Sequence, residues 1–153
     1  MHPLDPADDG DRAWLRALVW PGPQAADRLA RLDAAAEVAT REPARMLAGD
    51  LNDLLPEAVS LAPSGCTVVV FHTAVLLYLR RADREAFVRQ VRSLPVRWIA
   101  QEGRGVLPDI DAALPPVGRA RFGLSLDGRA LAGTAPHGGR IDWLPDARGL
   151  VVR

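Results

Sequence analysis

Hydrophobic residues recur at helical spacing through much of the first hundred positions. From about Gln24 to Arg41, leucine and alanine return every three or four residues while charged residues fall between them, which predicts an amphipathic helix. Asp11 is expected to cap a shorter helix before it, following an extended lead-in over residues 1–11. Two more helices are predicted. The first covers Leu51–Ala62, capped by Asn52 or Asp53, with Pro56 in its first turn and Leu55, Ala58, Val59 and Ala62 buried. The second runs from about Asp83 to Ser93, with Phe87, Val91 and Leu94 facing inward.

The most apolar stretch of the chain is Thr67–Leu79, TVVVFHTAVLLYL. Its unbroken run of apolar residues up to Phe71 lacks the alternation of a half-exposed strand, so we expect a central strand over Thr67–Phe71 that is covered on both faces. His72 and Thr73 interrupt the run just after this strand. Val96–Ala100 predicts a second core strand, and Ala44–Ala48 is a weaker candidate for another.

The periodicity changes towards the C-terminus. Residues 103–119 are rich in glycine and proline and predict a loop, with at most a short helix around Ile110–Leu114. In Arg121–Asp127, apolar and polar residues alternate strictly, and Asp127–Gly128 is a strong hairpin turn signal. Arg129–Thr134 and Arg140–Leu144 would complete an antiparallel meander over 121–144.

Strands separated by helical segments favour parallel crossover connections. The order of elements therefore predicts an α/β fold: parallel strands followed by an antiparallel meander. At 153 residues the chain fits a single domain, 1–153, with a substantial core.

Composition argues against several functional classes. Hydrophobic residues make up 48% of the chain, and 19 basic residues balance 19 acidic ones, so neither disorder nor a nucleic-acid partner is expected. Every basic residue is arginine, which rules out a lysine Schiff base or a P-loop lysine. The motifs of serine hydrolases, P-loop NTPases and zinc enzymes do not occur.

The expected compartment is the cytoplasm. The lone cysteine, Cys66, cannot form an internal disulfide, and it is expected to be inert. The first twenty residues carry acidic side chains where a signal peptide needs basic ones. No apolar run approaches the ~20 residues of a membrane helix, so we expect no membrane partner, and no Cys/His spacing suggests a metal site.

Two titratable residues follow the predicted core strands. Because ligands bind beyond the carboxyl ends of parallel strands, His72 and Glu102 are expected at the same rim of the sheet. There they could act as a general base and its orienting partner. The alternative is structural: His72 would cap the next helix and Glu102 would accept backbone N–H groups in its turn.

Other residues have two interpretations each. Tyr78 either lines a substrate pocket or belongs to the core with its hydroxyl at the surface. His137 lies in a PHGG turn and serves either the turn or a ligand. Arg80 and Arg81 either meet an anionic substrate or form a solvated helix start, and Trp143 is expected to pack the meander onto the sheet.

Several segments together resemble the bacterial family of uncharacterised proteins called DUF2332. These are WLRALVWP (Trp14–Pro21), AGDLNDLLP (Ala48–Pro56), TVVVFHTAVLLYL, RWIAQEG (Arg97–Gly103) and FGLSLDGRALAGTAPHGGRIDWL (Phe122–Leu144). The resemblance implies a Rossmann-like fold of the S-adenosylmethionine-dependent methyltransferase type, a three-layer sandwich. In that fold Ala44–Ala48, Thr67–Phe71 and Val96–Ala100 would be the third, fourth and fifth strands. Asp50 would lie near the adenine of the cofactor, unless it only caps the helix that follows, and Thr73 would contact substrate beside a catalytic His72.

The resemblance also implies that something is missing. The glycine-rich turn that cradles the cofactor has no counterpart here, so the chain resembles the C-terminal half of a longer protein and is not expected to be catalytically competent alone. The strand carrying Phe71 would then have an unpaired edge. We expect either a homodimer or pairing with the missing N-terminal half. The rival hypothesis is a non-catalytic interaction or regulatory module that pairs through this exposed sheet edge.

Overall fold

The computed structural model describes residues 4–116, 121–135 and 139–147. Two compact units divide the chain, Met1–Ala48 and Gly49–Arg153, and each is described by itself. The single domain expected from the chain length stays a prediction. In the described residues, no helix is both long and apolar enough to cross a membrane.

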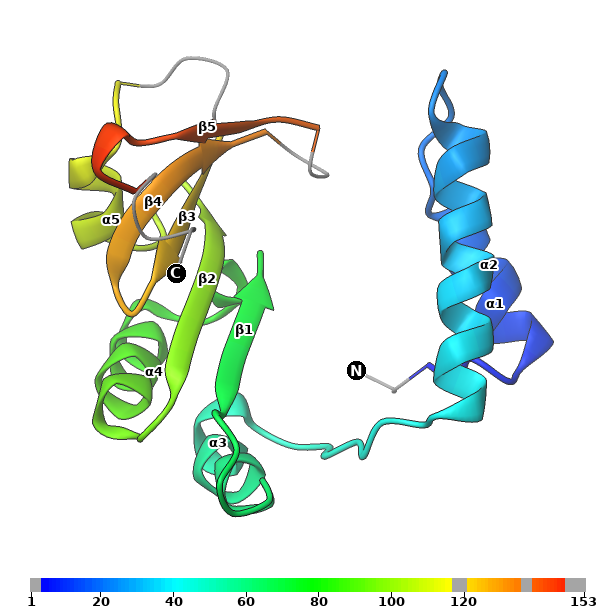
Figure 1. Cartoon of the computed structure of the whole chain (residues 1–153), viewed down its shortest axis with the longest axis horizontal. Coiled ribbons are helices and arrows are strands. Elements are labelled where there is room, and N and C mark those ends of the chain that lie inside the picture. Colours follow the sequence, from blue (N-terminus) through cyan, green and yellow to red (C-terminus); the bar gives the residue numbers. More distant parts are fainter. Residues whose placement is uncertain (1–3, 117–120, 136–138, 148–153) are drawn as a thin grey trace. The chain divides into compact units, whose positions relative to one another are not determined.

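The first unit is a pair of helices, α1 (Asp9–Ala17) and α2 (Ala25–Arg41) (Figure 1). An ion pair between Arg16 and Asp33 joins the two helices. The predicted cap was wrong: Asp8, not Asp11, caps α1, and its carboxylate accepts the Asp11 N–H at 2.8 Å. The extended lead-in is therefore shorter than predicted. Helix α2 matches its prediction, with Ala36 on the buried side.

The predicted strand at Ala44–Ala48 was also wrong. Residues 43–48 have no regular secondary structure, and Met46 is exposed. A strand forms only where a neighbouring strand takes up its backbone hydrogen bonds, and none of the described strands pairs with this segment. The apolar character of Ala44–Ala48 was therefore not sufficient to make the segment a strand.

The second unit contains one sheet whose strand order follows the chain, β1-β2-β3-β4-β5. Only β1 and β2 are parallel, and the remaining neighbours are antiparallel. The mixed α/β class is thus correct, with one parallel pair in place of the predicted series. The elements of this unit are α3 (Leu51–Ser60), β1 (Val69–Thr73), the 3-10 turn η1 (Leu76–Tyr78), α4 (Arg81–Ser93), β2 (Arg97–Gly103), α5 (Pro108–Ala113), β3 (Phe122–Leu126), β4 (Arg129–Thr134), β5 (Ile141–Trp143) and the 3-10 turn η3 (Pro145–Ala147).

The C-terminal meander forms in the predicted region, but the two sides of β3 are the reverse of what its alternation indicated: Gly123 and Ser125 are buried, while Phe122, Leu124 and Leu126 are only partly buried. Asp127 and Gly128, with φ of 52° and 80°, make the two-residue turn between β3 and β4, and both backbones adopt the left-handed conformation that such hairpin turns require. Helix α3 departs from its prediction at both ends and in its second turn. Asp50, not Asn52 or Asp53, caps it, and it ends at Ser60 rather than Ala62. Pro56 lies in its second turn rather than its first, and Ala58 is exposed while Leu55 is buried.

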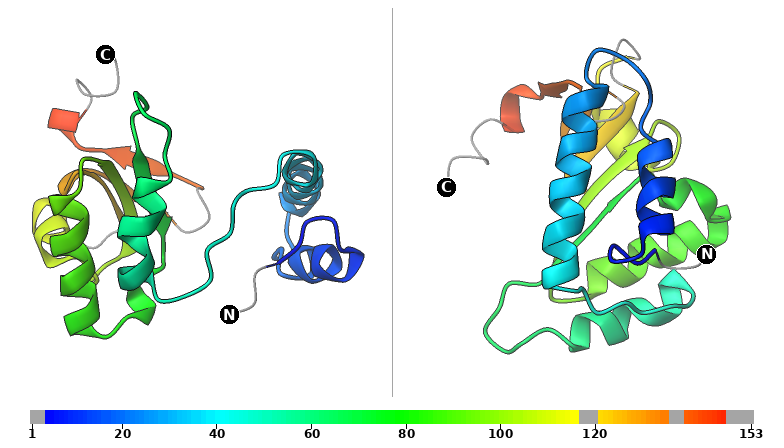
Figure 2. Two further views of the ribbon diagram at one scale, coloured as in Figure 1. Left: turned by 90° about the horizontal axis from the view of Figure 1, so that it is seen from below. Right: turned by 90° about the vertical axis from the view of Figure 1, so that its right-hand side faces the viewer.

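The core lies on one face of the sheet. Helices α4 and α5 cover this face in Figures 1 and 2, and Leu55 of α3 joins the same cluster as Phe87 of α4 and Ile110 of α5. Helix α5 approaches the sheet so closely that a Cβ on Gly123 would lie 2.8 Å from a methyl group of Leu114. Glycine at this position therefore sets the depth at which α5 packs.

Strand β1 differs most from its prediction. It runs from Val69 to Thr73 rather than from Thr67 to Phe71, and it lies at the edge of the sheet instead of the centre. Its alternate residues Val69 and Phe71 point away from the helices and are 46% and 77% exposed. The predicted burial on both faces was wrong because the helices described in this unit gather on one face. The described structure thus shows two layers, a sheet and its helices, in this unit.

The exposed face of the sheet is largely apolar. The register aligns Phe71, Ile99 and Leu126 across β1, β2 and β3. Trp143 and Ile141 of β5 continue this face, and both are more than a third exposed. The expectation that Trp143 packs the meander onto the sheet was wrong, because β5 is itself a strand of the sheet and Trp143 lies on its open side.

Candidate functional site

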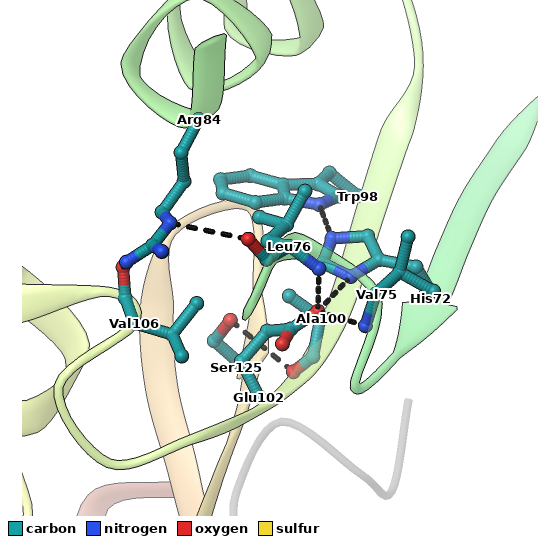
Figure 3. Close-up of polar contacts among 9 residues, drawn as sticks. All are labelled: His72, Val75, Leu76, Arg84, Trp98, Ala100, Glu102, Val106 and Ser125. Atoms are coloured by element: carbon teal, nitrogen blue, oxygen red, sulfur yellow. Dashed lines mark hydrogen bonds and ion pairs between the residues drawn. The ribbon is translucent and has the colours of Figure 1, made fainter. Parts of the chain in front are cut away.

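The structure brings His72 and Glu102 together, as their positions near the strand ends suggested. Both lie within their strands rather than after them, because β1 and β2 extend further than predicted. Their side chains point to the helix-covered face, and His72 Nδ1 lies 2.7 Å from Glu102 Oε1. The two side chains are only 8% and 1% exposed. The pair is therefore a buried contact between neighbouring parallel strands (Figure 3).

Trp98 fixes the proton arrangement of this pair. Its indole nitrogen donates to His72 Nε2 at 3.0 Å, and an indole N–H can only donate. Nε2 must therefore carry the lone pair, so the histidine proton sits on Nδ1 and is donated to Glu102. His72 is neutral in this arrangement, and both of its ring nitrogens are occupied.

Glu102 also holds the turn that follows β1. Its Oε1 accepts the backbone N–H groups of Val75 and Leu76, each at 2.9 Å, in addition to the His72 proton. The turn passes through Ala74, which has a φ of 52°, a conformation that costs energy for a residue other than glycine. The carboxylate compensates by satisfying the donors that this turn presents.

The protonation state of Glu102 follows from these contacts. Burial raises the pKa of the Glu102 carboxyl. The hydrogen bonds from His72 and from the two backbone N–H groups together lower the pKa by more than burial raises it, so the net pKa lies below its ordinary value. Glu102 is thus an anion in the folded protein. Its other oxygen, Oε2, is buried and has no hydrogen-bond partner among the described residues.

Aromatic rings enclose the pair. The His72 ring lies edge-on to Phe87, with centroids 5.4 Å apart, and is roughly stacked with Trp98 at 6.1 Å. Phe87 and Trp98 are themselves buried. A general base needs a free lone pair within reach of substrate, and His72 Nε2 is instead occupied by Trp98 within this cluster. The geometry therefore matches a structural hydrogen-bond network.

The remaining predicted site residues are spread over the unit. Asp50 caps α3, where its Oδ1 accepts the Asn52 N–H at 2.8 Å, which is the capping role expected of it. Thr73 ends β1 on the exposed face, and Tyr78 is 81% exposed, so it is not a core residue. His137 lies outside the described residues. Whether Asp50, Thr73 or Tyr78 contacts a ligand stays a prediction.

Sequence reasoning missed two residues that organise this region. Trp98 looked like an ordinary core residue of VRWIA, and only the pairing of β1 with β2 brings its indole to His72. Arg84 donates to the backbone oxygens of Leu76, Leu79 and Val106 at 3.2–3.3 Å, so it links η1 to the segment after β2 (Figure 3). The sequence carries no signal for that contact, because backbone carbonyls have no sequence signature.

The remaining candidate residues, two arginines and the cysteine, lie at the surface. Arg80 and Arg81 form exposed ion pairs with Asp83 and Glu85 at the start of α4, as expected of a solvated helix start. Cys66 is exposed, and its thiol is free. Among the described residues, no group of three or more His, Cys, Asp or Glu side chains is placed to hold a metal ion.

Fold and site together define an α/β unit with a mixed sheet, a buried His–Glu–Trp network and an edge strand, β1, whose outer side pairs with no other described strand. A family model described as "uncharacterized protein conserved in bacteria (DUF2332)" matches residues 1–143. The chain belongs to this family. No curated protein sequence matches it significantly, and neither does any solved structure.

Proposed function

We propose that this chain is a non-catalytic protein-interaction module that pairs with a second copy of itself through the free edge of β1. The observation that carries the proposal is the direction of the backbone groups in this strand. Arg97 donates its N–H to Val68 O, and Ala74 donates its N–H to Gln101 O, both at 2.9 Å. Residues 68 and 74 therefore face β2.

The residues between them follow by alternation. Successive backbone groups of a strand point to opposite sides, so residues 68, 70, 72 and 74 bond to β2. The N–H and C=O groups of Val69, Phe71 and Thr73 point the other way, along the edge of the sheet. Unpaired groups of this kind are a template for another strand.

This edge is complementary to itself. In an antiparallel pair of β1 strands centred on Phe71, the two Phe71 residues exchange both of their backbone hydrogen bonds, and Val69 of each copy does so with Thr73 of the other. All the outward groups of the strand are then satisfied. This arrangement has twofold symmetry, the commonest symmetry among soluble homo-oligomers.

The side chains of β1 also favour pairing. The strand VVFHT contains no charge and no proline, the features with which proteins usually protect a free edge. Two copies therefore meet without charge repulsion. Phe71, at 77% exposed, would lie beside the partner's phenylalanine, and such cross-strand aromatic pairs are favourable.

Sedimentation equilibrium and light scattering of the purified chain between about 1 and 100 micromolar test the proposal. Self-pairing predicts a concentration-dependent monomer–dimer equilibrium. A monodisperse monomer over this whole range would contradict it, as would a dimer that persists when the β1 edge is blocked.

Methyl transfer from S-adenosylmethionine, in a longer relative of which this chain would be the C-terminal half, is the second candidate. The parallel β1–β2 pair and the His72–Glu102 contact are the features in its favour. Isothermal titration of the chain with S-adenosylmethionine separates the two hypotheses. A dissociation constant in the micromolar range would contradict a purely non-catalytic module, and saturable binding should be absent if our proposal is correct.

A further inference from the structure

We propose that the pocket between α4 and α5 binds a small organic carboxylate with an aromatic body. This pocket has a volume of about 300 Å³, which lies at the small end of the range for ligand sites. It is built on the helix-covered side of the sheet and does not include the β1 edge. The inference is thus independent of the proposed self-pairing.

The floor of the pocket is apolar. Trp98 of β2, Val106 and Ile110 line it, and each is at least nine-tenths buried, while Val88 of α4 forms part of the wall. A surface of this kind favours a flat hydrocarbon group over a fully hydrated ion. Inorganic phosphate would leave the floor uncovered.

The rim of the pocket is basic. Arg84, Arg89 and Arg92 line it against two acids, Glu85 and Asp109. Glu85 is already bound by Arg81 at 2.9 Å, and Asp109 is 3.8 Å from Arg92. Arginine is therefore in excess, and its planar guanidinium matches a carboxylate with two parallel hydrogen bonds.

Arg84 adds a fixed positive charge to the pocket lining. Its three nitrogens each donate to a backbone carbonyl, and it takes part in none of the ion pairs found among the described residues. Carbonyl oxygens hold the guanidinium in place without neutralising it. The pocket thus combines an apolar floor with charges that a monocarboxylate would complement.

Titration of the ¹⁵N-labelled full chain with 2-naphthoate, followed by NMR, tests this assignment. The chain has four tryptophans, so the Trp98 indole signal can be assigned with Trp98→Phe and followed against the other three. We expect a saturable shift of the Trp98 signal. Trp14, Trp20 and Trp143, which are 59%, 71% and 37% exposed, should not shift.

Two substitutions and one neutral probe complete the test. The double variant Arg89→Gln/Arg92→Gln should weaken naphthoate binding at least tenfold. Arg80→Gln removes one positive charge, against two in the pocket variant, from the N-terminal end of the same helix and outside the pocket, and should change the affinity less than twofold. Replacing naphthoate with 2-naphthamide should weaken binding at least tenfold.

The inference is overturned if the Trp98 signal does not respond at millimolar naphthoate, or if the exposed tryptophans respond instead. It is also overturned if Arg80→Gln weakens binding as much as the pocket variant, because the effect would then be general electrostatics. Equal affinity for the acid and the amide would exclude the role of the arginines. The folding of each variant is checked in its own spectrum before titration.

Discussion

Replacing Phe71 by serine should abolish self-association of the chain while leaving the unit folded. The side chain lies on the edge strand and points away from the core, so its removal leaves no cavity. Serine keeps the backbone N–H and C=O that face the partner. The substitution thus removes apolar contact across the interface without removing the hydrogen-bonding groups.

The magnitude follows from the exposed fraction. A phenylalanine side chain presents roughly 200 Å², so 77% exposure leaves roughly 150 Å² in water. A neighbouring strand covers about half of that area, which at about 25 cal/mol per Å² is worth about 2 kcal/mol per copy. Both copies lose this contact, so the dimer should weaken by about 4 kcal/mol, roughly a thousandfold in the dissociation constant.

Sedimentation equilibrium measures this change directly. Tyr78→Ser is a matched control, because Tyr78 is also an exposed aromatic residue, at 81%, but lies in η1 and not on the edge strand. It should leave the dissociation constant within about threefold of the original. Equal weakening by both substitutions, or no weakening by Phe71→Ser, would refute the assignment of the interface to β1.

Two further predictions concern the covered face of the sheet. Glu102→Gln should lower the free energy of unfolding by about 2–3 kcal/mol at pH 7. Because the folded pKa of Glu102 is depressed, the contribution of its charge is complete above the unfolded value of about 4.3 and is lost as pH falls through the lower folded value. In urea titrations the stability difference between the two proteins should therefore shrink as the pH falls below about 4. A difference that does not vary with pH would show that the carboxylate charge is irrelevant. Gly123→Ala should destabilise by about 1–3 kcal/mol because its Cβ would lie 2.8 Å from Leu114, while Gly103→Ala, whose nearest neighbour would be 3.9 Å away, should cost clearly less; equal effects in denaturant unfolding would contradict close packing of α5.

Local patterns predicted the elements whose signals are local. The spacing of Phe87 and Val91 marked the buried side of α4, and Asp127–Gly128 marked the hairpin turn. The failures concern long-range pairing. The residues of Ala44–Ala48 do not reveal that the segment lacks a partner among the described strands. The apolar run ending at Phe71 does not reveal which faces of its sheet are covered.

In the candidate site, too, local patterns predicted part of the arrangement and long-range pairing decided the rest. Strand ends placed His72 and Glu102 near each other, and the structure brings them into contact. Their interpretation depends on a third residue, Trp98, whose indole N–H occupies His72 Nε2. A tryptophan within a core strand carries no sequence signal for such a bond, so the sequence could not show that both ring nitrogens of His72 already have hydrogen-bond partners.

Amide hydrogen exchange of β1, measured by NMR at low and high protein concentration, tests the proposed edge pairing most directly. The amides of Val70 and His72 face β2 and should be protected at every concentration. Those of Val69, Phe71 and Thr73 face outward, and we predict that they exchange rapidly in the dilute protein and become protected as the concentration rises. Fast exchange of these three amides at all concentrations, or protection that does not depend on concentration, would contradict pairing with a second copy.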